Sequence, residues 1–392
     1  MKLRRGRFST LAKGTVAATV FSLLAAACGS SSSSTPATTA PSSTNWATAT
    51  SASTGGGMAA LVAAAKKEGH LNVIALPPNW ANYGELITTF EQKYGISITS
   101  ENPDGSSAQE LAALKAEKGT SKEPDVVDVG PSFALLGAQQ GLFANYKVAQ
   151  WNNIPADAKD ANGAWFFDYG GYISIGYNAD AFSANPPTSF ASLLGSQYKG
   201  AVALNGNPTS AGAAFGAVFA ASLANGGSFD SIQPGLDYFK KLAQAGNYVP
   251  VQSSPAVIES GQIKVNIDWD YLNAAYATAV TGKVNWKVFV PNPGQYASYY
   301  AQAISASGPN PAAARLWEEF LYSAEGQNLW LKGFARPILL PAMQSAGTVN
   351  QSYLSLLPSV TGEPQFATPT QLSAGQALVA AQWPNISSGS AG

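Results

Sequence analysis

Hydrophobic and polar residues alternate along most of the chain in a pattern that predicts short strands separated by helices. The run 71–76 is almost wholly apolar, which is typical of a strand covered on both faces of a sheet. Leu86, Phe90 and Tyr94 recur at helical spacing, and Gly95 follows them as a helix stop. This alternation indicates an α/β fold with a mostly parallel sheet. The predicted strands are 71–76, 96–98, 125–129, 201–204, 263–267 and 286–290, and the main predicted helices are 58–67, 86–94, 107–114, 211–223, 236–245 and 311–323.

The stretch Gly170–Asn178 divides this pattern into two similar halves. Its side chains alternate as in a strand, and glycines at its start and near its end allow the backbone to bend. We therefore predict two lobes joined by this strand, with a cleft between them that closes on a ligand. The predicted boundaries are 58–171 for the first lobe, 172–298 for the second, and 299–392 for a return to the first lobe followed by C-terminal helices.

Three loops of the first lobe follow predicted strands, where open α/β sheets bind their ligands. They are 78–80, 104–107 and 130–133, and they supply the candidate ligand residues Asn79, Trp80, Ser106 and Ser132. Trp80 is the strongest of these candidates, because a tryptophan in a Pro-Pro-Asn turn is poorly placed for a core. The alternative for each loop is a turn that binds nothing.

The second lobe offers a loop at 205–210 that leads into an apolar helix. Such a junction presents free backbone N–H groups and small hydroxyls, which suits an anionic or polar ligand group. Asn207, Thr209 and Ser210 are therefore candidates, although simple helix capping is the alternative. Tyr172, on the crossing strand, is a further candidate contact.

Composition narrows the function. The chain has 392 residues, of which 46% are hydrophobic and 11% charged, and its formal net charge is −1. No basic cluster is present that would favour nucleic acid. His70 and Cys28 are the single histidine and the single cysteine, so we expect neither a Cys/His zinc site nor a cofactor, and no intrachain disulfide is possible. His70 lies in a predicted loop and is a poor candidate for a catalytic triad.

The N-terminus predicts an export signal. A basic segment with Arg4 and Arg5 precedes an apolar stretch at 16–27, which is too short to span a membrane in the mature protein. The stretch ends at Cys28 and resembles a lipobox, although Ala25 stands where leucine is usual. We predict a signal peptide at 1–28 with a lipidated Cys28, then a Ser/Thr-rich tether at 29–57. A plain secretory signal is the alternative, and the paired arginines hint at twin-arginine export.

Several segments together resemble the bacterial extracellular solute-binding proteins of ABC importers, in the branch that holds iron(III), polyamine, thiamine and phosphonate binders. The resemblance covers about 58–343, and it implies a two-lobed, type II periplasmic-binding-protein fold with crossing hinge strands. It also implies a monomer outside the cytoplasm that passes a small solute to a membrane permease with its ATPase. The segments that carry it are Leu61–Gly69, Phe90–Gly95, Pro124–Val129, Ile175–Asn178 and Ala313–Gln327.

The resemblance also bears on the ligand. Iron binders of this branch carry adjacent tyrosines after the strand that corresponds to 263–267, where this chain has Asp268, Trp269 and Asp270. The pair Tyr299-Tyr300 occurs later in the chain. An aromatic face with carboxylates suits an ammonium group, so these three residues predict a polyamine-like cation. The alternative is that Asp268 caps a helix and Trp269 packs in the core.

Two other classes of function compete with an importer component. A secreted glycosidase would use paired carboxylates, such as Asp268 with Asp270 or Asp125 with Asp128. Asp125 and Asp128 are three residues apart, so a strand would point them to opposite faces. No nucleophile motif or glycine-rich phosphate loop accompanies either pair. We therefore expect a binding protein and not an enzyme. A binding module that feeds a sensor is the second alternative.

Overall fold

The computed structural model describes residues 45–361 and 365–388. The predicted signal peptide, Cys28 and the first part of the predicted tether lie outside these residues. The rest of that tether, 45–57, packs against the body, where Trp46 and Ala49 are buried. Arg315 donates hydrogen bonds to the carbonyl oxygens of Ala47 (3.1 Å) and Ala49 (2.9 Å). The packed part of the chain therefore begins before Met58, because Trp46 supplies a large apolar side chain to the core.

One sheet organises the described residues, with the strand order β2-β1-β3-β9-β5-β7-β6. Three short strands join it at the side, β4 on β9 and both β8 and β10 on β5. The strands are β1 (His70–Ile74), β2 (Ser97–Glu101), β3 (Val126–Val129), β4 (Phe143–Ala144), β5 (Phe166–Asn178), β6 (Val202–Leu204), β7 (Val265–Trp269), β8 (Trp286–Phe289), β9 (Ala297–Ser305) and β10 (Arg336–Pro337).

Lobe 1 is the part built on β1, β2 and β3, which pair in parallel as predicted. The sheet as a whole is mixed and not mostly parallel as predicted, because β9 pairs antiparallel with β3 and with β5. The strand β3 is buried along its whole length. Gly95 ends α2 in the left-handed conformation with φ 67°, which glycine adopts without steric cost. The helices of lobe 1 are α1 (Met58–Glu68), α2 (Tyr83–Tyr94), α3 (Ser107–Ala116), α4 (Pro131–Gln139), α9 (Pro311–Leu321), α10 (Ala324–Lys332), α11 (Leu340–Ala346) and α12 (Gln351–Leu354).

Lobe 2 is the part built on β6, β7 and β8. The strand β6 runs parallel to β7, and both β7 and β8 pair antiparallel with the second half of β5. The helix α5 is buried along most of its length, which explains why its sequence is apolar all round. The helices of lobe 2 are α5 (Gly212–Ala224), α6 (Gln233–Gln244), α7 (Pro255–Glu259) and α8 (Asp270–Ala279).

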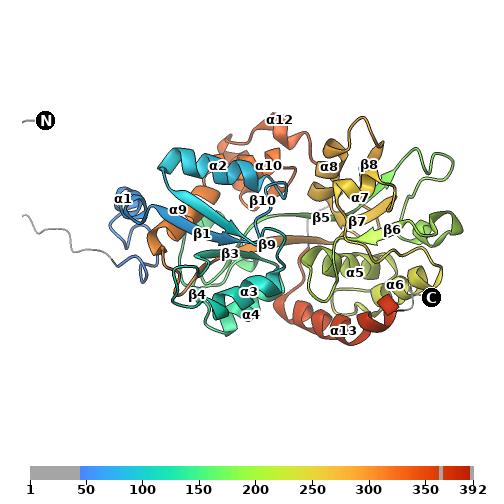
Figure 1. Cartoon of the computed structure of the whole chain (residues 1–392), viewed down its shortest axis with the longest axis horizontal. Helices are drawn as coiled ribbons and strands as arrows, with labels where there is room; N and C mark the ends of the chain where they lie inside the picture. Colours follow the sequence, from blue (N-terminus) through green and yellow to red (C-terminus); the bar gives the residue numbers. More distant parts are fainter. Residues whose placement is uncertain (1–44, 362–364, 389–392) are drawn as a thin grey trace, which may run out of the picture. The chain divides into compact units, whose positions relative to one another are not determined.

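Two strands, β5 and β9, join the lobes and pair with each other in antiparallel fashion (Figure 1). The first half of β5 pairs with β9 and β10, and its second half pairs with β7 and β8. A side chain on Gly170 would clash with the Ser298 carbonyl oxygen, and one on Gly171 with the Asp270 carboxylate. These glycines therefore permit close packing at the crossing. The predicted boundaries at 171/172 and 298/299 fall inside these two strands.

The C-terminal region contains one long helix, α13 (Pro369–Ser388). It packs against α6 of lobe 2 and α4 of lobe 1, and Figure 1 shows it running past both. The sequence predicts only loose helical pieces beyond about residue 345.

Candidate functional site

A cleft of about 810 Å³ lies between the two lobes. Its lobe 1 wall consists of the loops after β1 and β2 together with Asp128 of β3. Its lobe 2 wall consists of the loop 205–211 after β6, the start of α5, the segment 252–255 and the first turns of α8. Loops beyond the carboxyl ends of the strands therefore line the cleft, as expected for an open α/β sheet.

Asp128 brings a buried carboxylate to this cleft. Its side chain is 6% exposed, and its Oδ2 accepts hydrogen bonds from the hydroxyls of Tyr83 (2.7 Å) and Tyr169 (2.9 Å). Its Oδ1 has no hydrogen-bond partner among the described residues. Two tyrosines thus fix the carboxylate through Oδ2, while Oδ1 is buried without a donor, which is costly in free energy.

Two further carboxylates line the cleft. Glu110 of α3 is buried, and its Oε2 accepts a hydrogen bond of 3.0 Å from the backbone N–H of Asp128. Asp104 is exposed at the loop after β2. No lysine, arginine or histidine of the described residues lines the cleft. The charged side chains around this space are therefore all acidic.

Burial sets the titration of these acids. It raises the pKa of Asp128 to about 7, although the hydrogen bonds from Tyr83 and Tyr169 favour the charged form. Burial and then the charge of Asp128 raise the pKa of Glu110 well above its ordinary value. The same two causes, in the same order, raise the pKa of Asp168 and of Glu318 behind the cleft. None of the four carboxyl groups forms an ion pair within the described residues.

Aromatic side chains surround the buried acid. The Trp80 indole N–H donates to the Tyr169 hydroxyl at 2.7 Å, and this hydroxyl donates to Asp128. The Trp80 ring packs edge-to-face against Tyr271 of α8 (6.0 Å) and Tyr300 of β9 (5.8 Å). Trp80 therefore joins lobe 1 to lobe 2 and to the hinge. Rings beside carboxylates are the usual surroundings of a bound organic cation.

The lobe 2 wall is a turn followed by the N-terminus of α5. The Asn207 side-chain oxygen accepts hydrogen bonds from the backbone N–H and the hydroxyl of Thr209, both 2.9 Å, and so fixes the turn. Gly212 opens α5, and a side chain there would begin 3.0 Å from the Tyr300 hydroxyl. The absence of that side chain lets α5 approach the hinge strand β9 closely.

Comparison with known proteins identifies the family to which this architecture belongs. A family model described as bacterial extracellular solute-binding protein matches residues 121–354. The chain belongs to this family. It is therefore the solute-binding component of an ABC importer and not an enzyme. No curated protein sequence matches it significantly.

Solved structures match this solute-binding protein at low sequence identity and show its mixed α/β, type II fold. The periplasmic binding protein AfuA from Actinobacillus pleuropneumoniae, with fructose 6-phosphate bound, has 20% identity over 81% of this chain and 98% of its own, at a TM-score of 0.66. Iron-bound HitA from Pseudomonas aeruginosa has 18% identity over 81% and 99%, at 0.61. A putative spermidine/putrescine ABC transporter protein from Listeria monocytogenes has 12% identity over 80% and 99%, at 0.60.

The structure of this solute-binding protein places five of the predicted ligand residues at the cleft. They are Asn79, Trp80, Ser106, Asn207 and Ser210. Their contact with a solute stays a prediction. Thr209 is exposed beside the cleft and fixes the turn through Asn207.

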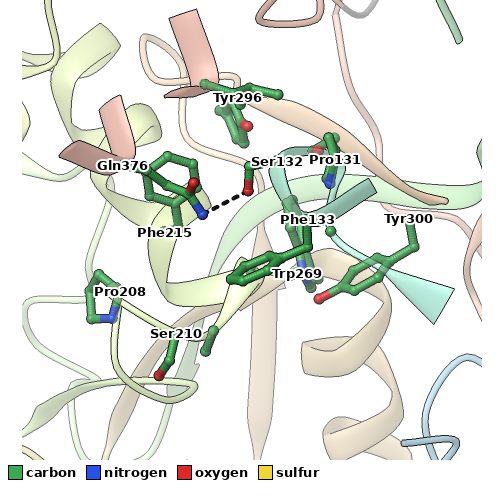
Figure 2. A pocket seen from close by; sticks show the side chains of 15 residues that line it. Pro131, Ser132, Phe133, Pro208, Ser210, Phe215, Trp269, Tyr296, Tyr300 and Gln376 are labelled. Carbon is green, nitrogen blue, oxygen red and sulfur yellow. Dashed lines mark hydrogen bonds between the residues drawn. The ribbon is translucent and has the colours of Figure 1, made fainter. Parts of the chain in front are cut away.

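Ser132 and Trp269 line a second pocket of about 20 Å³. Ser210 and Tyr300 line both this pocket and the cleft. Figure 2 shows Trp269 and Tyr300 side by side in this pocket, with Gln376 of α13 pointing to Ser132. Tyr172 lines neither space. It is buried, with the Arg336 guanidinium 5.1 Å from its ring centre.

Asp268 and Asp270 are both fully buried, and neither is among the residues that line the cleft. Asp270 forms an ion pair with Arg336 and accepts hydrogen bonds from the backbone N–H groups of Tyr172 and Tyr271, both 3.0 Å. Asp268 accepts a hydrogen bond of 2.8 Å from the backbone N–H of Trp269. These contacts give both carboxylates local partners, so the acids at the cleft surface come from lobe 1.

Sequence reasoning missed Asp128, Glu110 and Tyr300 as cleft residues. A signal for Asp128 was present, because an aspartate inside an otherwise apolar strand requires a partner or a function. Glu110 gives no such signal, since a glutamate on a helix is ordinarily exposed. Tyr300 stands out in the sequence only as half of the pair Tyr299-Tyr300.

The two members of that pair lie on opposite faces of β9, as adjacent residues of a strand do. Tyr300 lines the cleft, whereas Tyr299 stacks on Phe167 (6.3 Å) and packs against Phe366 (5.4 Å). Among the described residues, no group of three or more His, Cys, Asp or Glu side chains could hold a metal ion. Nor is any helix of this part of the chain long and apolar enough to cross a membrane.

Proposed function

We propose that this protein captures a small organic cation, polyamine-like in its charge, in the interlobe cleft and delivers it to the permease of its importer. We also propose that lipid at Cys28 anchors it to the outer face of the cell membrane. The observation that carries the first proposal is the charge of the cleft, where every charged side chain that lines it is acidic.

The aromatic residues support the same class of ligand. A bound ammonium or ring nitrogen gains attraction from the faces of Trp80 and Tyr300, and from the Asp128 carboxylate that Tyr83 and Tyr169 hold in place. Because Asp128 has no ion-pair partner in the described chain, a cationic ligand supplies the missing countercharge. Spermidine, putrescine and thiamine fit this description.

Iron and phosphate-bearing solutes are the alternatives within the same family. Two tyrosines that point to opposite faces of β9 cannot share one iron ion. A phosphate would meet the N-terminus of α5, which favours anions, but it would also meet three carboxylates and no cationic side chain of the described residues. The cleft therefore favours a cation over an anion.

The decisive experiment is isothermal titration calorimetry of the purified full chain against spermidine, putrescine, thiamine, ferric citrate, fructose 6-phosphate and aminoethylphosphonate. We expect binding of one or more organic cations. The substitution Asp128→Asn should then weaken binding about 30-fold or more, because removing one member of a buried charge pair costs about 2–5 kcal/mol. The same change at exposed Asp104 should cost less than about fivefold, since exposed pairs contribute about 0–1 kcal/mol.

Other outcomes would identify the alternatives. Binding of a phosphate compound that survives Asp128→Asn would favour the α5 site and contradict the cationic proposal. Binding of ferric citrate alone, lost on Tyr300→Phe, would establish an iron carrier.

A further inference from the structure

The helix α13 contacts both lobes and carries three glutamines that reach different partners. Gln371 and Gln382 hydrogen-bond to lobe 2, and Gln376 hydrogen-bonds to lobe 1. One helix therefore spans the two bodies that must move relative to each other when the cleft opens.

The attachment of α13 to lobe 2 is extensive. The amides of Gln382 and Gln233 exchange two hydrogen bonds, of 2.7 and 3.1 Å, and Gln371 donates to Asp230 at 2.8 Å. Trp383 is 1% exposed and packs edge-to-face against Phe239 (5.5 Å) and Tyr248 (6.0 Å). With this much apolar surface buried, we expect α13 to move with lobe 2 as one body.

The contact with lobe 1 is smaller, and it combines packing of α13 against α4 with one side-chain hydrogen bond. Gln376 Nε2 donates to the hydroxyl of Ser132 at 2.8 Å, and Ser132 is the second residue of α4 (Figure 2). Around this hydrogen bond lies the pocket of about 20 Å³, lined by groups from lobe 1, lobe 2, β9 and α13. The space left by imperfect packing makes this contact easier to separate than the lobe 2 attachment.

We propose that α13 is a clasp carried by lobe 2, and that the Gln376–Ser132 hydrogen bond holds lobe 1 in the closed arrangement. Gln376 and Ser132 are then positioning residues for solute capture, since neither needs to touch the solute. The inference rests on the two-lobed binding function and not on the ligand being a cation. A single neutral hydrogen bond shifts an equilibrium roughly three- to tenfold, which suits a clasp that must release in every transport cycle.

The test measures the distance between the lobes without any solute. Cys28 is the single cysteine, so Cys28→Ser gives a background for spin labels at Lys118→Cys in lobe 1 and Lys287→Cys in lobe 2, both exposed. Pulsed electron paramagnetic resonance then gives the distribution of distances between the two spin labels. We expect Gln376→Ala to raise the ratio of long to short distances roughly three- to tenfold, and Ser132→Ala to reproduce this from the other side.

The matched control is Gln382→Ala, which removes two hydrogen bonds from the same helix but none to lobe 1. It should leave the distances unchanged. The clasp is disproved if Gln376→Ala and Ser132→Ala both keep the parental distribution, or if Gln382→Ala opens the lobes equally. Since no solute is present, either result is independent of whether the cationic proposal holds.

Discussion

Asp128 is a buried acid at the cleft, and its proposed role in binding follows from the free-energy cost of its burial. An ionised carboxylate that is buried without a countercharge costs free energy, and this cost raises its pKa to about 7. Tyr83 and Tyr169 recover part of the cost and fix one oxygen. Under our proposal, a bound cation offsets the rest of this cost, so Asp128 would increase the affinity for the cation while it destabilises the empty protein.

The affinity for an organic cation should therefore depend on pH. A cation favours the ionised form of Asp128, so binding must release a proton wherever the empty protein holds one. We expect the affinity to rise as the pH increases from 6 to 8 through the pKa of about 7, by up to tenfold per pH unit below it. Calorimetry in buffers of different ionisation enthalpy measures both the affinity and the protons released.

The stability of the empty protein should show the opposite trend. The pKa of Asp128 is raised on folding, so between about pH 4 and 7 the folded state holds a proton that the unfolded state has lost. The free energy of unfolding must then fall as the pH increases through this window, and buried Glu110, Asp168 and Glu318 act in the same direction.

The substitution Asp128→Asn is the control for the pH dependence of binding, because it should flatten the plot of cation affinity against pH. A profile that remains steep in this variant would assign the proton to another group.

Single residues were only partly predictable from sequence. Loop position sufficed to place Asn79, Trp80 and Ser106 at the cleft, because the carboxyl ends of parallel strands face it. The same reasoning selected Asp268 and Asp270, which follow β7, yet Asp270 has its ion-pair partner in Arg336, 66 residues later. Which of several acids is neutralised within the fold depends on tertiary contacts that no local pattern records.

At the scale of elements, the crossing strand β5 depends on its glycines. The substitution Gly170→Ala places a methyl group against the Ser298 carbonyl oxygen and the Tyr299 backbone, which cannot move without breaking the pairing with β9. We expect the free energy of unfolding to fall by about 1–3 kcal/mol or more. Urea unfolding, followed by circular dichroism, measures this change.

Gly130→Ala, at a glycine outside β5, is the control for Gly170→Ala. Gly130 has φ −60°, which any residue adopts, and the nearest atom to an added methyl group is the Ser107 hydroxyl at 3.9 Å. Since alanine is only a poorer N-cap than glycine, the loss should stay below about 1 kcal/mol. If Gly170→Ala lowers the free energy of unfolding no more than Gly130→Ala does, then β5 tolerates the methyl group.

Most elements followed well from the hydrophobic pattern, since the helices α1, α2, α3, α5, α6 and α9 lie near their predicted positions. The long helix α13 did not. Its inward residues Val379, Trp383 and Ile386 have helical spacing, but Pro384 interrupts the run. A proline inside a periodic run ordinarily indicates the end or a kink of a helix, so this pattern did not predict one long helix.

At the scale of the whole molecule, the two lobes and the hinge have a consequence for transport. Both lobes line the cleft, so its opening would separate Trp80 of lobe 1 from Tyr271 of lobe 2. A binding protein of this kind must also stay near its permease. The lipid that we propose at Cys28 would provide that proximity.

The anchor can be tested in a bacterial host that expresses the full chain. We expect the parent protein to incorporate labelled palmitate and to fractionate with the membrane, and Cys28→Ser to lose both properties, because only a cysteine can accept the lipid. A second variant, Cys28→Ser with Ser31→Cys, keeps one cysteine but moves it three residues from the small residues 25–27. It should remain unlabelled, which separates recognition of the site from the mere presence of a thiol. If the parent protein itself stays in the membrane fraction without label, then the apolar stretch 16–27 is the anchor and the lipoprotein assignment is wrong.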